Sequence, residues 1–269
     1  MMLWEGTLEK MAAHWGKPVT YRLGEEENSC AVNELLGTRL CLEYLHEIHC
    51  IVCGRKTKKA FGQGFCYPCF VKSPENAECI VRPELCRGHL GEGRDVEWEK
   101  AHHVQPHVVY LAQSSGIKVG VTRSSQVPTR WIDQGASAAL VLAETPNRFL
   151  AGSLEVALKK TFADKTDWRK MLMNAASSEN LIEAKEKAVE HTPVELQPYL
   201  INNNDIMQIE YPVLDFPTKP NSISLDKQET IVGTLMGIKG QYWIWDQNRV
   251  WNLRNHSGYR VRLSALPKE

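Results

Sequence analysis

Alternation of apolar and polar residues predicts β-strands in several parts of the chain. PVTYRL (18–23) and TRLCLEYL (38–45) are rich in β-branched and aromatic residues, which is typical of strands. HVVYLAQ (107–113) and IKVGVT (117–122) predict two further strands, because the turn-forming SSG separates them. SAALVLAE (137–144) is nearly all apolar and therefore predicts a buried strand.

Helical periodicity follows these strands. SSQVPTRWIDQGA (124–136) predicts a loop and a short helix, with Pro128 at an early helical position and Gly135 as its end. NRFLAGSLEVALKKTF (147–162) predicts an amphipathic helix with Asn147 as N-cap. We expect another helix in TDWRKMLMNAA (166–176), a charged helical arm over 178–200, and a linker at NSISLDKQ (221–228).

The C-terminal stretch has the pattern of a β-meander. Its predicted strands are ETIVGTLMGI, QYWIWD, RVWNLR and YRVRLSAL, with turns at Gly240, near Asn248 and at NHSG. Because each end of the chain offers only a few strands, we expect the two terminal β segments to share one core. Four large rings lie close together in the meander: Tyr242, Trp243, Trp245 and Trp251. Core packing is the simpler explanation of these rings, and a platform for stacking nucleic-acid bases is the alternative.

These elements predict an α+β fold with a zinc knuckle, a small α/β unit and β segments at both termini. The predicted parts are an N-terminal β segment (1–48), a zinc-binding region (49–105), an α/β domain (106–177), a helical arm with linker (178–222) and a β-meander (223–269).

Composition is that of a globular protein, with 43% hydrophobic and 24% charged residues among 269. No apolar run approaches the roughly 20 residues that a bilayer requires. The N-terminal MMLWEGTLEKMAAHWGK lacks the apolar core of a signal peptide. We therefore expect a cytoplasmic protein that has no membrane partner.

Four of the eight cysteines stand in two Cys-x-x-Cys pairs within HCIVCGRKTKKAFGQGFCYPCF (49–70). In a reducing compartment such pairs indicate a metal site rather than disulfides. Two knuckles of this kind deliver four thiolates to a tetrahedral zinc ion, and a site with four protein ligands is structural. We predict structural Zn²⁺ on Cys50, Cys53, Cys66 and Cys69. Unligated thiols and a thioredoxin-like redox pair are the alternatives.

Charge is unevenly distributed around these cysteines. Residues 1–48 hold eight Glu and four Lys or Arg (net −4), whereas residues 49–72 hold five Lys or Arg and no acid (net +5). The net charge of the whole chain is zero, so any contact with a polyanion is expected to be local. Lys56, Lys58 and Lys59, with aromatic neighbours, suit phosphate contact and base stacking, although a solvated basic loop would have the same composition.

A second metal site is conceivable downstream. Cys79 and Cys86 follow in ECIVRPELCRGHLGEGRDVEWEKAHH, with His89 and then His102 or His103 as further nitrogen donors. We take Cys79, Cys86, His89 and His102 as a candidate second zinc site. The alternative is that the two cysteines are buried free thiols.

The segment VVYLAQSSGIKVGVTR resembles the catalytic core of the GIY-YIG nuclease superfamily, a three-stranded sheet flanked by helices. Tyr110 ends the first three-residue signature and Gly120 the second, while Arg130 and Glu155 follow on the predicted helices. The first signature has Val108 in place of glycine, and the second has Lys118 in place of tyrosine. Over nearly its full length the chain also resembles a family of uncharacterised bacterial proteins. In that family a zinc knuckle precedes segments like VYLAQSSGIKVGVTR and TRWIDQGA, and the chain ends with a stretch like GIKGQYWIWDQNRVWNLRNHSGY.

The nuclease resemblance implies roles for three residues. Tyr110 would help to activate the nucleophile, Arg130 would hold the phosphate, and Glu155 would bind a catalytic Mg²⁺ or Mn²⁺. Lys118 and Arg123 could add phosphate contacts. The small residues Ala151 and Gly152 lie one turn before Glu155, and we expect them to leave room for an ion and a phosphate.

Each of these residues also has a purely structural explanation. Tyr110 could be a core tyrosine, Arg130 a surface cation, and Glu155 an ion-pair partner of Lys159. The sequence thus favours a zinc-containing protein that binds DNA or RNA, with divalent-metal-dependent endonuclease activity as the catalytic hypothesis. The alternative is a non-catalytic module that docks RNA or a protein through its zinc knuckle.

Overall fold

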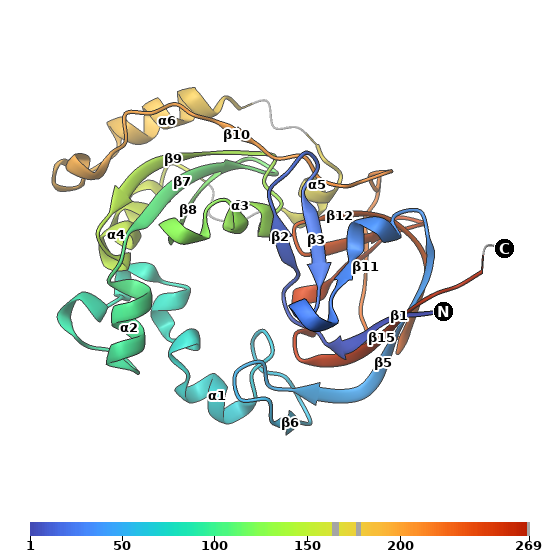
Figure 1. Cartoon of the computed structure of the whole chain (residues 1–269). Helices are drawn as coiled ribbons and strands as arrows, with labels where there is room; N and C mark the ends of the chain where they lie inside the picture. The colour runs from blue at the N-terminus through green and yellow to red at the C-terminus, as the bar shows by residue number, and fades with distance from the viewer. Residues whose placement is uncertain (163–166, 176–178, 268–269) are drawn as a thin grey trace. The chain divides into compact units, whose positions relative to one another are not determined.

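The protein has an α+β fold with several sheets, as the sequence predicts (Figure 1). The computed structural model describes residues 1–162, 167–175 and 179–267. Two compact units account for these residues: residues 1–71 with 209–269, and residues 72–208. The first boundary falls within the predicted zinc-binding region and the second within the predicted arm. The ends of the predicted helix 166–176 and the predicted boundary after residue 177 lie outside the described residues.

The first unit is built on a sheet to which both ends of the chain contribute, as expected. The order of its main path is β1-β15-β5-β12-β13-β14-β11, and β6 pairs with β5. A smaller antiparallel sheet has the order β2-β3-β4. The strands are β1 (Met2–Thr7), β2 (Ala12–His14), β3 (Thr20–Leu23), β4 (Cys30–Ala31), β5 (Arg39–His49), β6 (Lys56–Thr57), β11 (Asn221–Ile223), β12 (Thr230–Lys239), β13 (Tyr242–Trp245), β14 (Arg249–Asn252) and β15 (Tyr259–Ala265).

Strand β11 lies where the sequence predicts only a linker. Its residues pair in parallel with β14, with Asn221 opposite Arg249. The Asn221 N–H also donates to the carbonyl of Asn248 at 2.8 Å. Three residues are too few to show a periodic pattern, so this strand is specified by tertiary pairing rather than by local sequence.

The tryptophans of the meander form core, not a surface platform. Trp243, Trp245 and Trp251 are at most 1% exposed. The ring of Trp243 meets that of Trp251 edge-on, with centroids 5.6 Å apart at 85°. Such T-shaped pairs are a favoured arrangement of buried aromatic rings. With their faces covered, these three rings offer no surface on which bases could stack.

The second unit contains a sheet of order β10-β9-β7-β8, which adds one short edge strand to the three predicted ones. Its strands are β7 (His107–Gln113), β8 (Ile117–Arg123), β9 (Ala138–Thr145) and β10 (Met207–Gln208). The α-helices are α1 (Tyr67–Lys72), which ends at the boundary between the units, and α2 (Val96–His103), α3 (Thr129–Asp133), α4 (Arg148–Leu158), α5 (Trp168–Leu172) and α6 (Leu181–Glu190).

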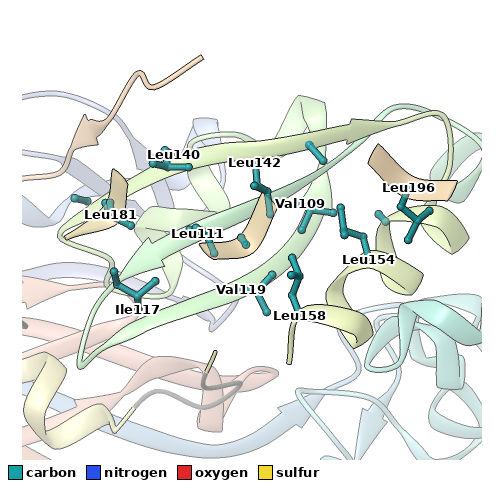
Figure 2. Close-up of a cluster of buried hydrophobic side chains, with 14 residues drawn as sticks. Val109, Leu111, Ile117, Val119, Leu140, Leu142, Leu154, Leu158, Leu181 and Leu196 are labelled. Carbon is teal, nitrogen blue, oxygen red and sulfur yellow. The ribbon is translucent and has the colours of Figure 1, made fainter. Parts of the chain in front are cut away.

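One face of this sheet is apolar and covered by helices. Val109 and Leu111 of β7 and Val119 of β8 pack against Leu154 and Leu158 of α4 (Figure 2). Because side chains alternate along a strand, the residues between them point to the opposite face. Tyr110, Lys118 and Gly120 are these intervening residues, and Tyr110 lies against Trp131 of α3 with ring centroids 5.8 Å apart.

Helix ends in this unit are set by local capping. Asn147 caps α4, since its Oδ1 accepts from the Leu150 N–H at 3.0 Å. Gly135 follows α3 with a φ of 71°, a left-handed conformation that favours glycine. Asp95 caps α2 by accepting from the Trp98 N–H at 3.0 Å.

Residues 73–95, all of which the structure describes, contain short 3₁₀ turns and no strand. The turns that matter below are η4 (Glu78–Ile80), η5 (Pro83–Leu85) and η6 (Gly88–Leu90). Across the described residues, no helix combines the length and the apolar character needed to cross a membrane.

Candidate functional site

The first candidate centre is the four-cysteine cluster of the first unit. The Sγ atoms of Cys50, Cys53, Cys66 and Cys69 all lie within 4.8 Å of one another. Those of Cys53 and Cys66 are 3.8 Å apart. Four sulfurs bonded to zinc at about 2.3 Å have tetrahedral edges of roughly 3.8 Å. The cluster can therefore hold a zinc ion with all four positions filled by protein.

Backbone geometry delivers these thiols in two knuckles. The first lies in the turn between β5 and β6, where the Gly54 N–H donates to the Cys50 carbonyl at 2.9 Å. The second opens α1, where the Phe70 N–H donates to the Cys66 carbonyl at 2.8 Å. Gly54 has a φ of 67°, which explains why glycine closes the first knuckle.

The surroundings of Cys50 and Cys69 shift their pKa values in opposite directions. Burial opposes ionisation of Cys50, but backbone N–H groups that include that of Cys66 lower its pKa to about 6. Burial, followed by hydrogen bonds to the other three sulfurs, raises the pKa of Cys69 to about 12. Four thiols at such short range cannot all ionise without a cation between them, so the arrangement favours metal over free thiols.

The hairpin between the two knuckles rests on the C-terminal meander. The Ile51 N–H donates to the Gly64 carbonyl at 3.0 Å. A Cβ on Gly64 would lie 2.7 Å from Ile51 Cγ2 and 2.9 Å from Ser257 Cβ. Arg254 also donates a hydrogen bond to the side chain of Gln63. Because these contacts leave no space, the hairpin is held in one position.

The basic residues of this hairpin are not equivalent. Lys56 forms an ion pair with Glu47 at 2.7 Å, so the N-terminal acidic segment neutralises it. Lys58 and Lys59 are exposed. The ammonium of Lys59 lies 5.5 Å from the centroid of the Phe61 ring, which is within cation–π range. The side chains that could meet an anion are thus Lys58 and Lys59 rather than Lys56.

The second cysteine pair of the sequence also comes together, with different companions from those predicted. Cys79 and Cys86 lie in one buried cluster with Glu99 and His103 of α2. His89 instead stacks on Phe149, with ring centroids 4.6 Å apart. His102 stacks on Trp98 at 4.1 Å, and its Nδ1 donates to the Trp98 carbonyl at 2.8 Å.

Helical geometry explains why His103, and not the predicted His102, lies in the cluster. Positions four residues apart share one face of a helix, so Glu99 and His103 point together while Trp98 and His102 point elsewhere. The adjacent pair His102–His103 left the choice open in the sequence. The spacing Glu-x-x-x-His, after the N-cap Asp95, was the signal that identifies Glu99 and His103.

The third candidate centre surrounds Tyr110 on the polar face of the β7–β8 pair. Tyr110 has no exposed surface, and its hydroxyl donates to Gln134 Oε1 at 2.9 Å. Burial raises the pKa of Tyr110, while Arg130 and the hydrogen bond with Gln134 oppose that rise. Arg130 is therefore close to the phenol, as the motif spacing predicts.

Gly120 makes the position of this tyrosine possible. Gly120 faces Tyr110 across the strand pair, and a Cβ there would lie 2.6 Å from the phenol oxygen. A register shift between Val109 and Tyr110 in the β7–β9 pairing marks a bulge beside it. Bulges re-aim side chains and are frequent beside functional sites.

Lys118 and Glu155 interact electrostatically with each other. The pKa of Lys118 is lowered to about 8. Burial is the largest cause, Arg130 adds to the shift, and Glu155 opposes it. Burial also raises the pKa of Glu155, and Lys159, which pairs with it at 3.4 Å, lowers it. The side chain of Glu155 keeps 12% exposure. Tyr110 and Lys118 each interact electrostatically with Arg130 and with Glu155, whereas Arg123 lies at the far end of β8, opposite His107.

The expected space beside Glu155 is filled by protein. A Cβ on Gly152 would lie 2.2 Å from the Glu84 nitrogen and 2.4 Å from the Pro83 carbonyl carbon. Ala151 is fully buried in the core. These small residues therefore allow η5 to pack directly on α4 and do not leave room for an ion and a phosphate at that turn.

This packing places two further charged residues near Glu155, neither of which the sequence analysis identified. Glu84 of η5 lies close enough to raise the pKa of Glu155, and its Oε2 is buried without a hydrogen-bond partner among the described residues. Arg148, at the start of α4, interacts electrostatically with Glu155 and Arg130. No local motif singles out either residue, because each is placed by the contact between η5 and α4.

Comparison with known proteins places the chain in a family. The family model described as "Protein of unknown function (DUF2797)" matches residues 37–261. No curated protein and no solved structure matches the chain. The family match covers both cysteine clusters and the Tyr110 site. It also agrees with the resemblance to an uncharacterised family noted above. Since it spans well over half of the sequence, the chain belongs to the family described as Protein of unknown function (DUF2797).

Proposed function

We propose that this chain is a zinc-containing nucleic-acid-binding protein whose Tyr110 site hydrolyses phosphodiester bonds. The carrying observation is that two cations, Lys118 and Arg148, interact electrostatically with the carboxylate of Glu155, while a third, Arg130, interacts with the buried phenol of Tyr110. A phosphate needs cations of this kind, and a partly desolvated site strengthens each contact. The resemblance of this segment to GIY-YIG nucleases supports the same reaction.

The residues present would divide the chemistry as follows. Arg130 and Lys118 would hold the phosphate and stabilise its charge as the bond breaks. The hydroxyl of Tyr110, oriented by Gln134, would accept a hydrogen bond from the attacking water and so position it, and the proton of that water would pass to the solvent. A divalent cation, when bound, supplies Lewis-acid stabilisation of the leaving oxygen.

Two carboxylates suit such a cation. Mg²⁺ and Mn²⁺ prefer oxygen ligands and keep several waters, so one or two carboxylates suffice. Glu155 is partly exposed, and Glu84 offers a buried oxygen without a hydrogen-bond partner among the described residues. Because η5 fills the space at Gly152, such a cation would bind on the exposed side of the Glu155 carboxylate.

The zinc hairpin would add a separate contact. Lys58 and Lys59 are exposed on a loop that the four-cysteine cluster and the meander hold in place. Contacts of this kind neutralise phosphates without reading sequence, so they contribute affinity that falls with salt.

The test is a cleavage assay with labelled single-stranded, duplex and branched DNA and RNA in Mg²⁺ or Mn²⁺. We expect Glu155→Gln and Arg130→Ala each to reduce cleavage by about a hundredfold or more, as removal of one transition-state contact does elsewhere. Glu186→Gln and Lys187→Ala, exposed charge changes on α6 of the same unit, are the matched controls and should retain full activity.

Cleavage that persists at the wild-type rate in Glu155→Gln would contradict this mechanism. Equal cleavage in every variant would indicate a contaminating nuclease, and cleavage that is lost in the α6 controls as well would indicate a folding defect. Circular dichroism of every variant detects such a defect.

A second function is favoured by two observations: Tyr110 has no exposed surface, and Glu155 already pairs with Lys159. A scaffold that binds nucleic acid without turnover would have the same features. In that case oligonucleotides should bind with an affinity that Lys58→Glu and Lys59→Glu reduce and that omission of Mg²⁺ and Mn²⁺ leaves unchanged. No substrate would then be cleaved.

A further inference from the structure

We propose that Cys79, Cys86, Glu99 and His103 form a second metal site, occupied by zinc, in the interior of the second unit. Its ligand set differs from the one that spacing suggests, and it includes a carboxylate. The proposal is independent of the nuclease activity.

Geometry is the first support. The four ligand atoms lie within 4.8 Å of one another. His103 Nδ1 is 3.6 Å from Cys86 Sγ and 3.9 Å from Cys79 Sγ. Bonds of about 2.3 Å to sulfur and about 2.0 Å to nitrogen would separate such atoms by roughly 3.6 Å in a tetrahedron. Two sulfurs, one nitrogen and one carboxylate oxygen are thus close enough to share one ion, which would replace the direct contact between His103 Nδ1 and the Glu99 carboxylate.

Burial is the second support. All four residues are at most 8% exposed. Glu99 and His103 also contact each other through the carboxylate and Nδ1. An interior made of two thiols, a carboxylate and an imidazole is costly to desolvate without a cation. A zinc ion would turn this set of donors into a bonded centre with all positions filled, which is the form of structural sites.

Charge balance and backbone contacts are the third support. Two thiolates and one carboxylate around Zn²⁺ leave a net charge of about −1. Arg148 supplies the opposite charge: its Nε donates to the Cys79 carbonyl at 3.0 Å and its Nη2 to the Ile80 carbonyl at 2.9 Å. The Gly88 N–H also donates to Cys86, as backbone N–H groups do to Cys50 in the first cluster.

The ion would hold the irregular segment 79–86 in place. This segment contains no strand and packs on α4 through η5 at Gly152. Metal bonds to Cys79 and Cys86 on one side, and to α2 on the other, would fix η5 and therefore the position of Glu84. Folding energy for such a short-turn segment commonly comes from metal binding.

The test is the zinc content of the full-length chain, purified without a histidine tag and measured by mass spectrometry. We expect two zinc ions per chain for the wild type and one each for Cys86→Ser and His103→Ala. His102→Ala and His89→Ala are the matched controls and should keep two ions, although His102 is the immediate neighbour of His103.

Glu99 and the first cluster give further readouts. Glu99→Gln should bind the second ion at least about tenfold more weakly in chelator competition, because even an outer-sphere partner contributes that much. If His103→Ala does not fold, Cys53→Ser provides the complementary measurement, and it should retain one zinc ion on the second cluster. One zinc ion in the wild type, or two in His103→Ala, would overturn the proposal; in that case Glu99 and His103 form a buried ion pair beside two thiols.

Discussion

The two cysteine clusters of this protein have different surroundings. In the four-sulfur cluster Cys53 is exposed, and the cluster lies on a hairpin that carries basic side chains. In the mixed cluster, which consists of Cys79, Cys86, Glu99 and His103, every residue is buried, and its neighbours are the helices α2 and α4. The first cluster shapes a surface loop, whereas the second organises an interior contact beside the Tyr110 site. Metal-ligand residues can thus support a surface loop or a packed interior, depending on their surroundings.

Substitution of one cysteine in each cluster should produce the largest difference between the clusters, in the hydrogen exchange of the surrounding elements. Cys86→Ser leaves a carboxylate, an imidazole and a thiol buried without their partner, which costs about 3–5 kcal/mol. We expect hydrogen exchange to rise across β7, β8 and α4 in this variant. Cys53→Ser should raise exchange in the first unit and leave these elements protected. Unchanged exchange of α4 in Cys86→Ser would show that the mixed cluster does not stabilise this contact.

The contact between η5 and α4 should be nearly as sensitive. Gly152→Ala places a methyl group 2.2 Å from the Glu84 nitrogen, and overpacking of this kind costs about 1–3 kcal/mol. Ser153→Ala is the matched control, because the Ser153 hydroxyl donates to the Phe149 carbonyl of its own helix. Denaturant unfolding measures both variants. Equal stability of the two would mean that η5 does not pack on α4 as described.

Acid–base behaviour should distinguish the Tyr110 site from the zinc hairpin. The pKa of Lys118 is lowered to about 8, so its positive charge is present below pH 8 and is lost as pH rises through that value. Oligonucleotide binding through Lys118 should therefore weaken between pH 7 and 9, and Lys118→Arg should remove this dependence. Fluorescence anisotropy at constant salt measures both proteins.

The same shift has an opposite consequence for folding. Unfolded Lys118 retains its proton up to pH 10.5, whereas the folded residue releases it near pH 8. Between these values the unfolded state binds more protons, so the burial of Lys118 costs less stability as pH rises.

Oligonucleotide binding that is independent of pH in the wild type would exclude Lys118 from the anion site.

The smallest expected effect lies on the hairpin. Lys58→Glu with Lys59→Glu should weaken oligonucleotide binding and reduce the slope of log K against log salt by about 2. Lys56→Ala should change it less, because Glu47 already neutralises Lys56. Equal effects of the three lysines would indicate a diffuse field rather than contacts by this loop.

Sequence patterns predict the elements whose information is local. The alternation in 107–123 predicts β7 and β8, Asn147 predicts the start of α4, and two Cys-x-x-Cys pairs predict the four-sulfur cluster. Each of these signals lies within one short window of the sequence.

What the sequence does not predict depends on long-range contacts. Strand β11 exists because β14 pairs with it, and Glu84 reaches the Tyr110 site because η5 packs on Gly152. The mixed cluster joins two irregular turns to one face of α2. Its histidine is selected by the rotation of that helix, which places His103 and not His102 beside Cys86.

Anomalous X-ray diffraction at the zinc absorption edge tests the two-cluster account most directly. We predict two peaks per chain, one bonded to the sulfurs of Cys50, Cys53, Cys66 and Cys69. The other should be bonded to two sulfurs, the Nδ1 atom of His103 and a carboxylate oxygen of Glu99. A single peak at the four-sulfur cluster, with Glu99 and His103 bonded only to each other, would contradict it.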